Sequence, residues 1–324
     1  MTGDTARRAL SLRISVTDRC QLRCVYCMPP SGVRKRACDE ILSFEEIIRF
    51  VQIVKSRYDL SKVHITGGEP LVRPGVADLV AMLAEEAIPD LALTTNGQNL
   101  AEMAAPLRLA GLHRVNVSLD TLDGAAYAEL TRGGDIGRTL AGIEEAQRAG
   151  LAPVKLNTVV LRGHNDHEVT ELACFALRRG CSIRFLELMP IGCARGLWGD
   201  CFISAAEVRA RLEQRFALEP LFHAPGGSSR NFLAEDRRGL RGIIGFIASE
   251  SQPFCASCTR LRLTSTGEAI SCLACGTGPE LKELLRSSAP DSEARIVALL
   301  SEELERKRPR ERFSTPRHMA AVGG

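Results

Sequence analysis

The chain has 324 residues, 45% of them hydrophobic and 25% charged, so it is long enough for one large domain or about two ordinary ones and is not disordered. Its net charge of +3 excludes the strongly basic composition that is typical of nucleic-acid binding. The first residues contain no apolar segment of a secretory signal, and no run of about 18 apolar residues predicts a membrane-spanning helix. We therefore expect a cytoplasmic protein without a membrane or nucleic-acid partner.

Short β-type runs alternate with helical patterns between residue 11 and about residue 190. The predicted strands are 12–17, 62–66, 91–95, 114–119, 154–160 and 182–188, and the predicted helices between them are 43–58, 75–87, 99–111, 136–150 and 166–180. Ser43 and Glu46 form a capping box, and Gly111, Gly150 and Gly180 are suited to end helices. Since eight βα units close a full barrel, six units predict an α/β fold with an open or partial barrel.

After about residue 195 the βα alternation stops. Residues 204–216 predict a helix, and residues 225–242 predict a turn-rich or hairpin segment. The charge-dense segment 303–312 is interpreted as a solvated surface. These changes divide the chain into a barrel region, 1–195, and a C-terminal region, 196–324.

The first cysteine group is "CQLRCVYC", which places Cys20, Cys24 and Cys27 within eight residues. Three thiolates in one short loop suit an iron–sulfur cluster that has one iron without a protein ligand. Such an iron could coordinate a small molecule, as the open position of a catalytic zinc site does. A zinc site completed by a distant residue, or thiols without a metal, remain alternatives at this spacing.

The second cysteine group is "CASCTRLRLTSTGEAISCLAC", with Cys255, Cys258, Cys272 and Cys275. The two CxxC pairs are close to a zinc-ribbon pattern, although the spacer is slightly short. Alternatively, the first three of these cysteines hold a second iron–sulfur cluster and Cys275 is not a ligand. The iron content of the protein separates the two interpretations.

Several motifs resemble those of a known family. The pattern CxxxCxxC with Tyr26 before its last cysteine, together with "GGEP" after the second predicted strand, resembles the radical S-adenosylmethionine (radical SAM) enzymes. "SLRISVTDRC", "VKLNTVV", "RFLELMPIG", "CASCTRLRLT" and the terminal "RHMAAVGG" resemble the GTP 3′,8-cyclases of molybdenum cofactor biosynthesis. The resemblance implies a partial (βα)6 TIM-type barrel whose open side is closed by the C-terminal region. It also implies two 4Fe-4S clusters, with S-adenosylmethionine as a further cofactor.

The activity implied by this resemblance is a radical cyclisation. A 5′-deoxyadenosyl radical takes a hydrogen atom from ribose C3′ of GTP, and the product is (8S)-3′,8-cyclo-7,8-dihydroguanosine 5′-triphosphate, in the first step of molybdopterin biosynthesis. The resemblance further implies a low-potential electron donor such as a flavodoxin or ferredoxin, a downstream cyclic pyranopterin monophosphate synthase, and a homodimer.

The resemblance also assigns roles to individual residues. The first cluster is expected on Cys20, Cys24 and Cys27, and the second on Cys255, Cys258 and Cys272. The expected contacts of S-adenosylmethionine are Tyr26, Gly68, Ser118 and Met189. The expected contacts of GTP are Arg13, His64, Thr95, Lys155, Arg260, Leu261 and Arg262, with Lys62 and Arg184 as weaker candidates. The residues expected to be needed for catalysis are Arg13, Arg260, Arg262, Gly323 and Gly324.

One position departs from the family pattern, because His64 stands where the family usually has an arginine. A histidine is mostly neutral at pH 7 and supplies less positive charge. We expect GTP to bind with altered geometry or lower affinity, in preference to a paralogue with a modified substrate.

Two other functions compete with the cyclase. One is a radical SAM enzyme that modifies peptides or proteins and carries an auxiliary cluster. The other is a zinc-stabilised nucleotide-binding or sensor domain, which leaves the first cysteine group unexplained. The remaining cysteines receive no role: Cys38, Cys174, Cys181, Cys193, Cys201 and Cys275.

Overall fold

The computed structural model describes residues 7–34, 36–222, 226–274, 276–307, 315 and 317–323. All six predicted strands of the barrel region are confirmed, and they form consecutive parallel neighbours of one sheet. They are β1 (Ala9–Ser15), β2 (Asp59–Thr66), β3 (Asp90–Thr95), β4 (Arg114–Ser118), β5 (Lys155–Val159) and β6 (Ser182–Leu186).

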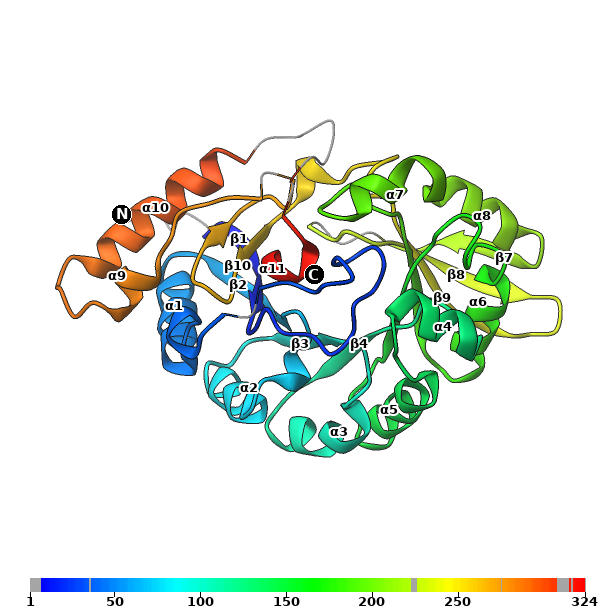
Figure 1. Cartoon of the computed structure of the whole chain (residues 1–324), viewed down its shortest axis with the longest axis horizontal. Coiled ribbons are helices and arrows are strands. Elements are labelled where there is room, and N and C mark those ends of the chain that lie inside the picture. The colour runs from blue at the N-terminus through cyan, green and yellow to red at the C-terminus, as the bar shows by residue number, and fades with distance from the viewer. Residues whose placement is uncertain are drawn as a thin grey trace, which may run out of the picture.

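Helices cover the outer side of the curved sheet (Figure 1). They are α1 (Phe44–Arg57), α2 (Val76–Glu85), α3 (Leu100–Leu109), α4 (Gly124–Thr131), α5 (Ile136–Arg148) and α6 (Val169–Arg178). The capping box of Ser43 and Glu46 starts α1 as predicted. Gly111, Gly150 and Gly180 have φ of +99°, +77° and +66°, the left-handed conformation expected after a helix end. Only α4 is absent from the predicted set, because its small residues give a weak apolar pattern.

The C-terminal region extends this sheet at both edges. Its strands are β7 (Phe216–Pro220), β8 (Arg230–Asp236), β9 (Arg241–Ile247), β10 (Arg260–Leu263) and β11 (Ala269–Ile270). β9 pairs in parallel with β6, and β10 pairs in parallel with β1. The predicted hairpin is confirmed as β8 and β9, but the parallel pairings of β9 and β10 were not predicted. Within the described residues β7 and β11 end the sheet, so the barrel is partial, as expected.

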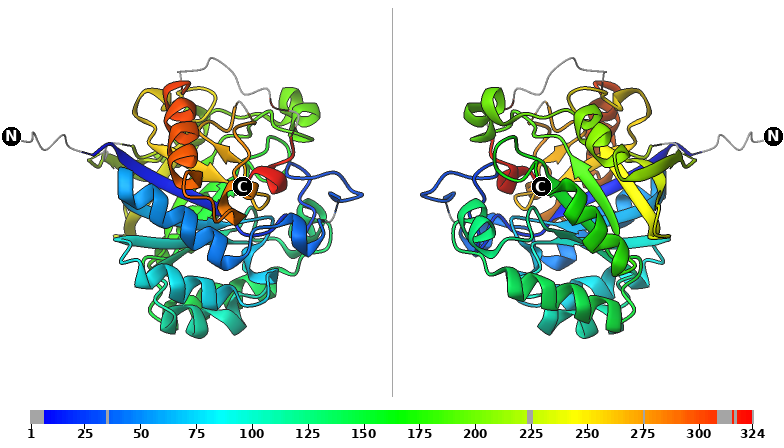
Figure 2. Two further views of the ribbon diagram at one scale, coloured as in Figure 1. Left: turned by 90° about the vertical axis from the view of Figure 1, so that its left-hand side faces the viewer. Right: turned by 90° about the vertical axis from the view of Figure 1, so that its right-hand side faces the viewer.

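The remaining helices follow β6 in the chain. They are α7 (Ala194–Cys201), α8 (Ala205–Glu213), α9 (Lys282–Arg286), α10 (Ser292–Glu305) and α11 (Met319–Val322), with three short 3-10 turns, η1 (Cys38–Glu40), η2 (Pro70–Val72) and η3 (Cys255–Ser257). Of these, α8 was predicted; it packs against α6, and α9 and α10 pack against α1. Figures 1 and 2 show α11 inside the open side of the sheet, close to β1 and β10. Among the described residues, no helix is long and apolar enough to cross a membrane.

The interpretation of 303–312 as a solvated surface holds for Glu305 and Arg306, which are exposed, but not for Glu303. Glu303, in the charge-dense segment, is only 6% exposed, and Lys307 donates a hydrogen bond to the backbone of β10. The reason is that Ile296, Leu300 and Leu304 anchor α10 in the core, which carries its last turn against the protein instead of into solvent. Residues 308–312 lie outside the described residues.

The hydrophobic core fills the space between the sheet and its helices. In β1, Leu12 and Ile14 are fully buried in this core, while Arg13 between them lines the opposite, inner face. This alternation is the period of two that strands impose on their side chains. Polar side chains of several strands are thereby gathered on the inner side of the barrel.

Candidate active site

The inner side of the barrel encloses a cavity of about 760 Å³. Both cysteine groups border it, through Cys20, Cys24 and Cys27 on one part of the wall and Cys255, Cys258 and Cys272 on another. The two groups are more than 220 residues apart in sequence, since Cys255 follows Cys27 by 228 positions. The fold therefore brings together the two groups that the sequence analysis treats as separate clusters.

The loop with the first cysteine group is held against α4 and β4. The amides of Arg23 and Val25 donate to the last carbonyls of α4 at 3.0 and 2.9 Å. The Arg132 guanidinium donates to the carbonyls of Arg23 and Met28, both at 3.0 Å. The Tyr26 hydroxyl donates to a carboxylate that follows β4. These contacts fix the backbone of the loop on both sides of Cys24.

The thiols of this loop fit an iron–sulfur cluster by their chemistry. Cys20, Cys24 and Cys27 form no disulfide and border the same cavity. Burial raises the pKa of Cys20 to about 11 and that of Cys27 to about 12, and the neighbouring Cys20 adds to the shift of Cys27. Bound iron would reverse these shifts, because a coordinating thiol is deprotonated. In the part of the chain that the structure describes, no three Cys, His, Asp or Glu side chains already stand close enough to hold a metal ion.

The second cysteine group is formed by two separate segments. Cys255 and Cys258 lie in and directly after η3, and Cys272 follows β11. Burial opposes the charged form of Cys258, but the Lys307 ammonium and the Arg260 amide and guanidinium outweigh burial and lower the pKa of that thiol. Three unpaired thiols on one cavity wall suit the same kind of cluster as the first group. The fourth thiol of the zinc interpretation, Cys275, lies outside the described residues.

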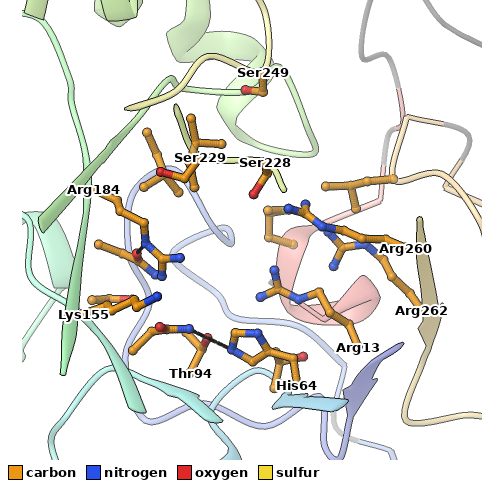
Figure 3. Close-up of a pocket in the computed structure, with 18 of the residues that line it drawn as sticks. Arg13, His64, Thr94, Lys155, Arg184, Ser228, Ser229, Ser249, Arg260 and Arg262 are labelled. Atoms are coloured by element: carbon orange, nitrogen blue, oxygen red, sulfur yellow. Dashed lines mark hydrogen bonds between the residues drawn. The ribbon is translucent and has the colours of Figure 1, made fainter. Parts of the chain in front are cut away.

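Positive side chains converge in the same cavity (Figure 3). Arg13 lies between Arg262 and His64 in the register of β10, β1 and β2. Arg260 is two residues before Arg262 on the same strand and also borders the cavity, as the alternation predicts. Burial and then Arg260 lower the pKa of Arg262 to about 10.

A second set of cations faces the cavity from β5, β6 and β2. Burial, then Arg114, lowers the pKa of Lys155 to about 8 and that of Arg184 to about 10. Lys62 also borders the cavity and pairs with Asp90 at 3.2 Å. Crowded, buried cations of this kind match a ligand with several negative charges, and arginine in particular suits phosphate oxygens.

His64 is a neutral member of this cluster. Its Nε2 lies 2.6 Å from the Thr94 hydroxyl and 2.9 Å from the Asn116 amide nitrogen. Burial, then Arg13 and Lys62, holds the pKa of His64 well below its ordinary value. The Asn116 oxygen accepts a hydrogen bond from Arg114, so its amide group donates to Nε2 and the ring proton lies on Nδ1. The sequence analysis did not find Thr94 or Asn116, whose only signal is that they are polar residues within predicted strands.

The four predicted contacts of S-adenosylmethionine, Tyr26, Gly68, Ser118 and Met189, all border the cavity. Gly68 lies against the chain itself, because a Cβ there would stand 2.5 Å from the Arg19 carbonyl oxygen. Thr95 also borders the cavity, but its hydroxyl donates to Glu69 at 2.7 Å.

Two predicted GTP-site or catalytic positions differ from the rest. The Leu261 side chain is fully buried in the core and is not among the residues that border the cavity, because it alternates with Arg260 and Arg262. The Gly323 carbonyl accepts a hydrogen bond of 2.6 Å from Arg262, which brings the C-terminal turn to the cation cluster. Gly324 lies outside the described residues. The sequence analysis also missed Lys307, which borders the cavity beside Cys258.

The other cysteines remain without a role in this site. Cys174, Cys181 and Cys201 are buried, and Cys38 is exposed. The Cys193 thiol donates to the Val25 carbonyl at 3.5 Å.

Comparison with known proteins places this geometry in a family. The radical SAM superfamily matches residues 14–176, and the family described as Molybdenum Cofactor Synthesis C matches residues 181–313. The chain is 44% identical to the GTP 3′,8-cyclase of Pelotomaculum thermopropionicum over 99% of both chains. It is 44% identical to that of Geobacter sulfurreducens over 88% of this chain and 86% of the relative.

Among solved structures, Streptococcus suis SuiB bound to the precursor peptide SuiA superposes with a TM-score of 0.60 at 17% identity. The superposition covers 82% of this chain and 60% of SuiB, so the chain spans about three fifths of that enzyme. At this identity the likeness shows the fold alone, and it agrees with the partial barrel. The relatives that match nearly the whole chain identify a more specific family than the fold does. The chain belongs to the radical SAM superfamily and, within it, to the GTP 3′,8-cyclase family.

Proposed function

We propose that this protein converts GTP to (8S)-3′,8-cyclo-7,8-dihydroguanosine 5′-triphosphate, with S-adenosylmethionine and two 4Fe-4S clusters. The observation that carries the proposal is that both cysteine triads and the cation cluster border one cavity. A nucleotide bound there can contact the surroundings of both triads at once. Holding the reacting groups in one chamber supplies much of the rate enhancement of such a reaction.

The triphosphate is held by the cation cluster. Arg13, Arg260 and Arg262 offer planar forks that pair with phosphate oxygens, and Lys155 offers a point charge. Lys62 and Arg184 extend the same surface. Phosphate oxygens stabilise the charged forms of these side chains and so offset the burial and the mutual repulsion that lower their pKa values.

The first cysteine loop would hold one cluster on Cys20, Cys24 and Cys27, with Tyr26, Gly68, Ser118 and Met189 around S-adenosylmethionine. When bound, these groups would supply the radical chemistry that takes a hydrogen atom from ribose C3′. The role of the protein chain is to orient the ribose and to exclude water. Cys255, Cys258 and Cys272 would hold the second cluster near the guanine.

His64 contributes a hydrogen bond without a charge. Its Nε2 is occupied by Asn116 and Thr94, so the Nδ1 proton is the group left for a nucleotide oxygen. We therefore expect GTP to bind more weakly than it would with a cation at this position. Gly323 completes the proposal, because its carbonyl orients the guanidinium of Arg262.

The wider setting belongs to the same proposal. A flavodoxin or ferredoxin supplies low-potential electrons, a cyclic pyranopterin monophosphate synthase uses the product, and the enzyme acts as a homodimer in the cytoplasm. The division into residues 1–195 and 196–324 stays a prediction, since β9 and β10 join the sheet of the first region.

The test is anaerobic incubation of the reconstituted protein with GTP, S-adenosylmethionine and reductant. We expect 5′-deoxyadenosine and a cyclised nucleotide together, from a protein with roughly eight irons per chain and no stoichiometric zinc. One zinc per chain with roughly four irons would exclude the second cluster. The Arg260 and Arg262 side chains beside the second triad favour a triphosphate over the peptide substrates of the alternative function.

A further inference from the structure

The end of α10 lies against the second cysteine group. Glu303 lies in the last turn of α10, and Lys307 follows four residues later, directly after the C-cap residue Arg306. Glu303 is 6% exposed, and Lys307 borders the active-site cavity. Neither was given a role by the sequence, in which both belong to a run of charges.

Glu303 contacts the segment that carries Cys272. One carboxylate oxygen accepts hydrogen bonds from the Ser271 amide at 3.1 Å and from the Ser271 hydroxyl at 2.6 Å. Ser271 directly precedes Cys272 and is itself 4% exposed. A buried carboxylate is stable only where such donors compensate for its lost hydration, so this contact is specific.

Lys307 contacts the segment that carries Cys258. Its ammonium group donates to the Arg260 carbonyl at 2.7 Å. Arg260 lies two residues after Cys258, so this backbone contact holds the short stretch that carries the thiol.

These two side chains do not form the ion pair that their spacing allows. Their neighbours Glu302 and Arg306, also four residues apart, do pair at 3.5 Å, with side chains that are 61% and 73% exposed. Within the described residues, no ion pair joins Glu303 to Lys307; each charge is instead directed to one half of the cysteine group.

The second cysteine group depends more than the first on contacts that hold its segments in place. Cys20, Cys24 and Cys27 lie on one short loop, whose backbone sets their separation. Cys258 and Cys272 are 14 positions apart and belong to different segments on either side of β10 and β11. A site assembled from two segments binds its ligand well only if their relative position is fixed beforehand.

We propose that Glu303 and Lys307 are positioning residues of the second cysteine group. Glu303 fixes the Cys272 half, Lys307 fixes the Cys258 half, and α10 sets the separation between the two halves. The inference rests on the proposed function, in which this group holds the second iron–sulfur cluster.

The test compares the iron content of anaerobically reconstituted full-length variants. Glu303→Leu and Lys307→Met remove the polar contact at similar side-chain volume. We expect each to retain roughly four irons where the wild type holds roughly eight. Because the first cysteine loop is untouched, both variants should still cleave S-adenosylmethionine under reducing conditions, while the cyclised nucleotide is lost.

Two sets of matched variants show whether the contact itself matters. Glu303→Gln keeps an acceptor and Lys307→Arg keeps a donor, so both should stay close to the wild-type iron content. Glu302→Leu and Arg306→Met likewise replace a charged side chain with an apolar one, one position earlier and on the exposed face, and should hold the full iron complement.

The outcomes separate this inference from the function on which it rests. A wild type with roughly eight irons, together with Glu303→Leu and Lys307→Met variants that hold the same number, would overturn the positioning role. Loss of both clusters in Glu303→Gln and Lys307→Arg as well would also overturn it, since that result indicates a general folding role. A wild type that never exceeds roughly four irons would overturn the proposed function and this inference with it.

Discussion

Tyr26 and Asp120 share a hydrogen bond of 2.5 Å that joins the first cysteine loop to the end of β4. The other oxygen of Asp120 accepts the Val159 amide at 2.8 Å, so the same carboxylate also reaches the end of β5. Burial raises the pKa of Asp120 to about 6, although both hydrogen bonds oppose the rise. The ionised carboxylate thus depends on these two donors at neutral pH.

We predict that Tyr26→Phe destabilises the protein more at pH 8 than at pH 5. The folded-state pKa of Asp120 lies above its ordinary value of 3.8, so stability from its protonated form is present at low pH and is lost as pH rises through about 6. Loss of the hydroxyl raises this pKa further and costs about 1.5–3 kcal/mol when the carboxylate is charged. Urea unfolding at the two pH values measures the difference.

Tyr58→Phe is the matched control for this prediction. The Tyr58 hydroxyl contacts the Ser301 hydroxyl at 3.3 Å, which is a neutral pair away from the cysteine loop. Its loss should cost about 1 kcal/mol or less at both pH values. Equal, pH-independent losses in the two variants would show that Asp120 does not depend on Tyr26 for its charge.

The strand positions and the inner-facing cations could be predicted because both follow from local sequence. Apolar runs and helix signals alternate clearly through the first 190 residues, and the two-residue spacing of Arg260 and Arg262 puts both on one face. The same alternation places the Leu261 side chain in the core. The expected contact of Leu261 with GTP therefore conflicts with the strand pattern that places Arg260 and Arg262 in the cavity.

The contributions of distant segments could not be predicted in the same way. The sequence near β9 does not indicate that this strand pairs with β6, because tertiary packing determines which strands pair. Likewise, Glu303 and Lys307 look like any surface charges until α10 is placed against the core. Thr94 and Asn116 became recognisable only through their shared contact with His64.

His64→Arg should tighten GTP binding by roughly tenfold at low salt, since a charge-assisted hydrogen bond to phosphate is stronger than a neutral one. Added salt should reduce this gain. The free protein should become less stable, because a new guanidinium would be buried beside Arg13 and Lys62 and would displace the contacts with Asn116. Anaerobic equilibrium dialysis with GTP at two salt concentrations measures the affinity.

His64→Gln serves as the control, because it changes shape without adding charge and should not tighten binding. If His64→Arg binds GTP no better than the wild type, a lack of positive charge does not limit affinity at this position, and our account of His64 is wrong.

GTP binding should weaken as pH rises from 7 to 9. Lys155 has a pKa of about 8 in the free protein, lowered chiefly by burial, and phosphate would raise it on binding. Below pH 8 the ammonium is already charged, so affinity changes little. Above pH 8 binding must take up a proton, and the Kd should rise roughly tenfold between pH 7 and 9. In Lys155→Met the affinity should be lower and nearly independent of pH in this range. An identical pH dependence in the two proteins would assign the effect to another group.

Gly323→Ala should reduce formation of the cyclised nucleotide while the iron content stays unchanged. Gly323 has a φ of +77°, and a Cβ there would lie 3.0 Å from the Ser15 Cβ and from the Thr66 hydroxyl. The added methyl group therefore strains the backbone and pushes the C-terminal turn away from Arg262, whose guanidinium donates to the Gly323 carbonyl. Turnover and GTP affinity, measured together with cluster content, separate this local effect from a loss of folding.

Gly239→Ala is the comparison that isolates the contact from the backbone strain. Gly239 has a similar φ of +80°, but no atom lies within 4 Å of the position of a Cβ there, in the turn between β8 and β9. Both variants carry the same conformational penalty, so only Gly323→Ala should lower turnover.

Removal of the last two residues should have at least as large an effect on turnover as Gly323→Ala. Full turnover after that deletion would mean that the C-terminal turn is not part of the active site, whatever its position beside Arg262.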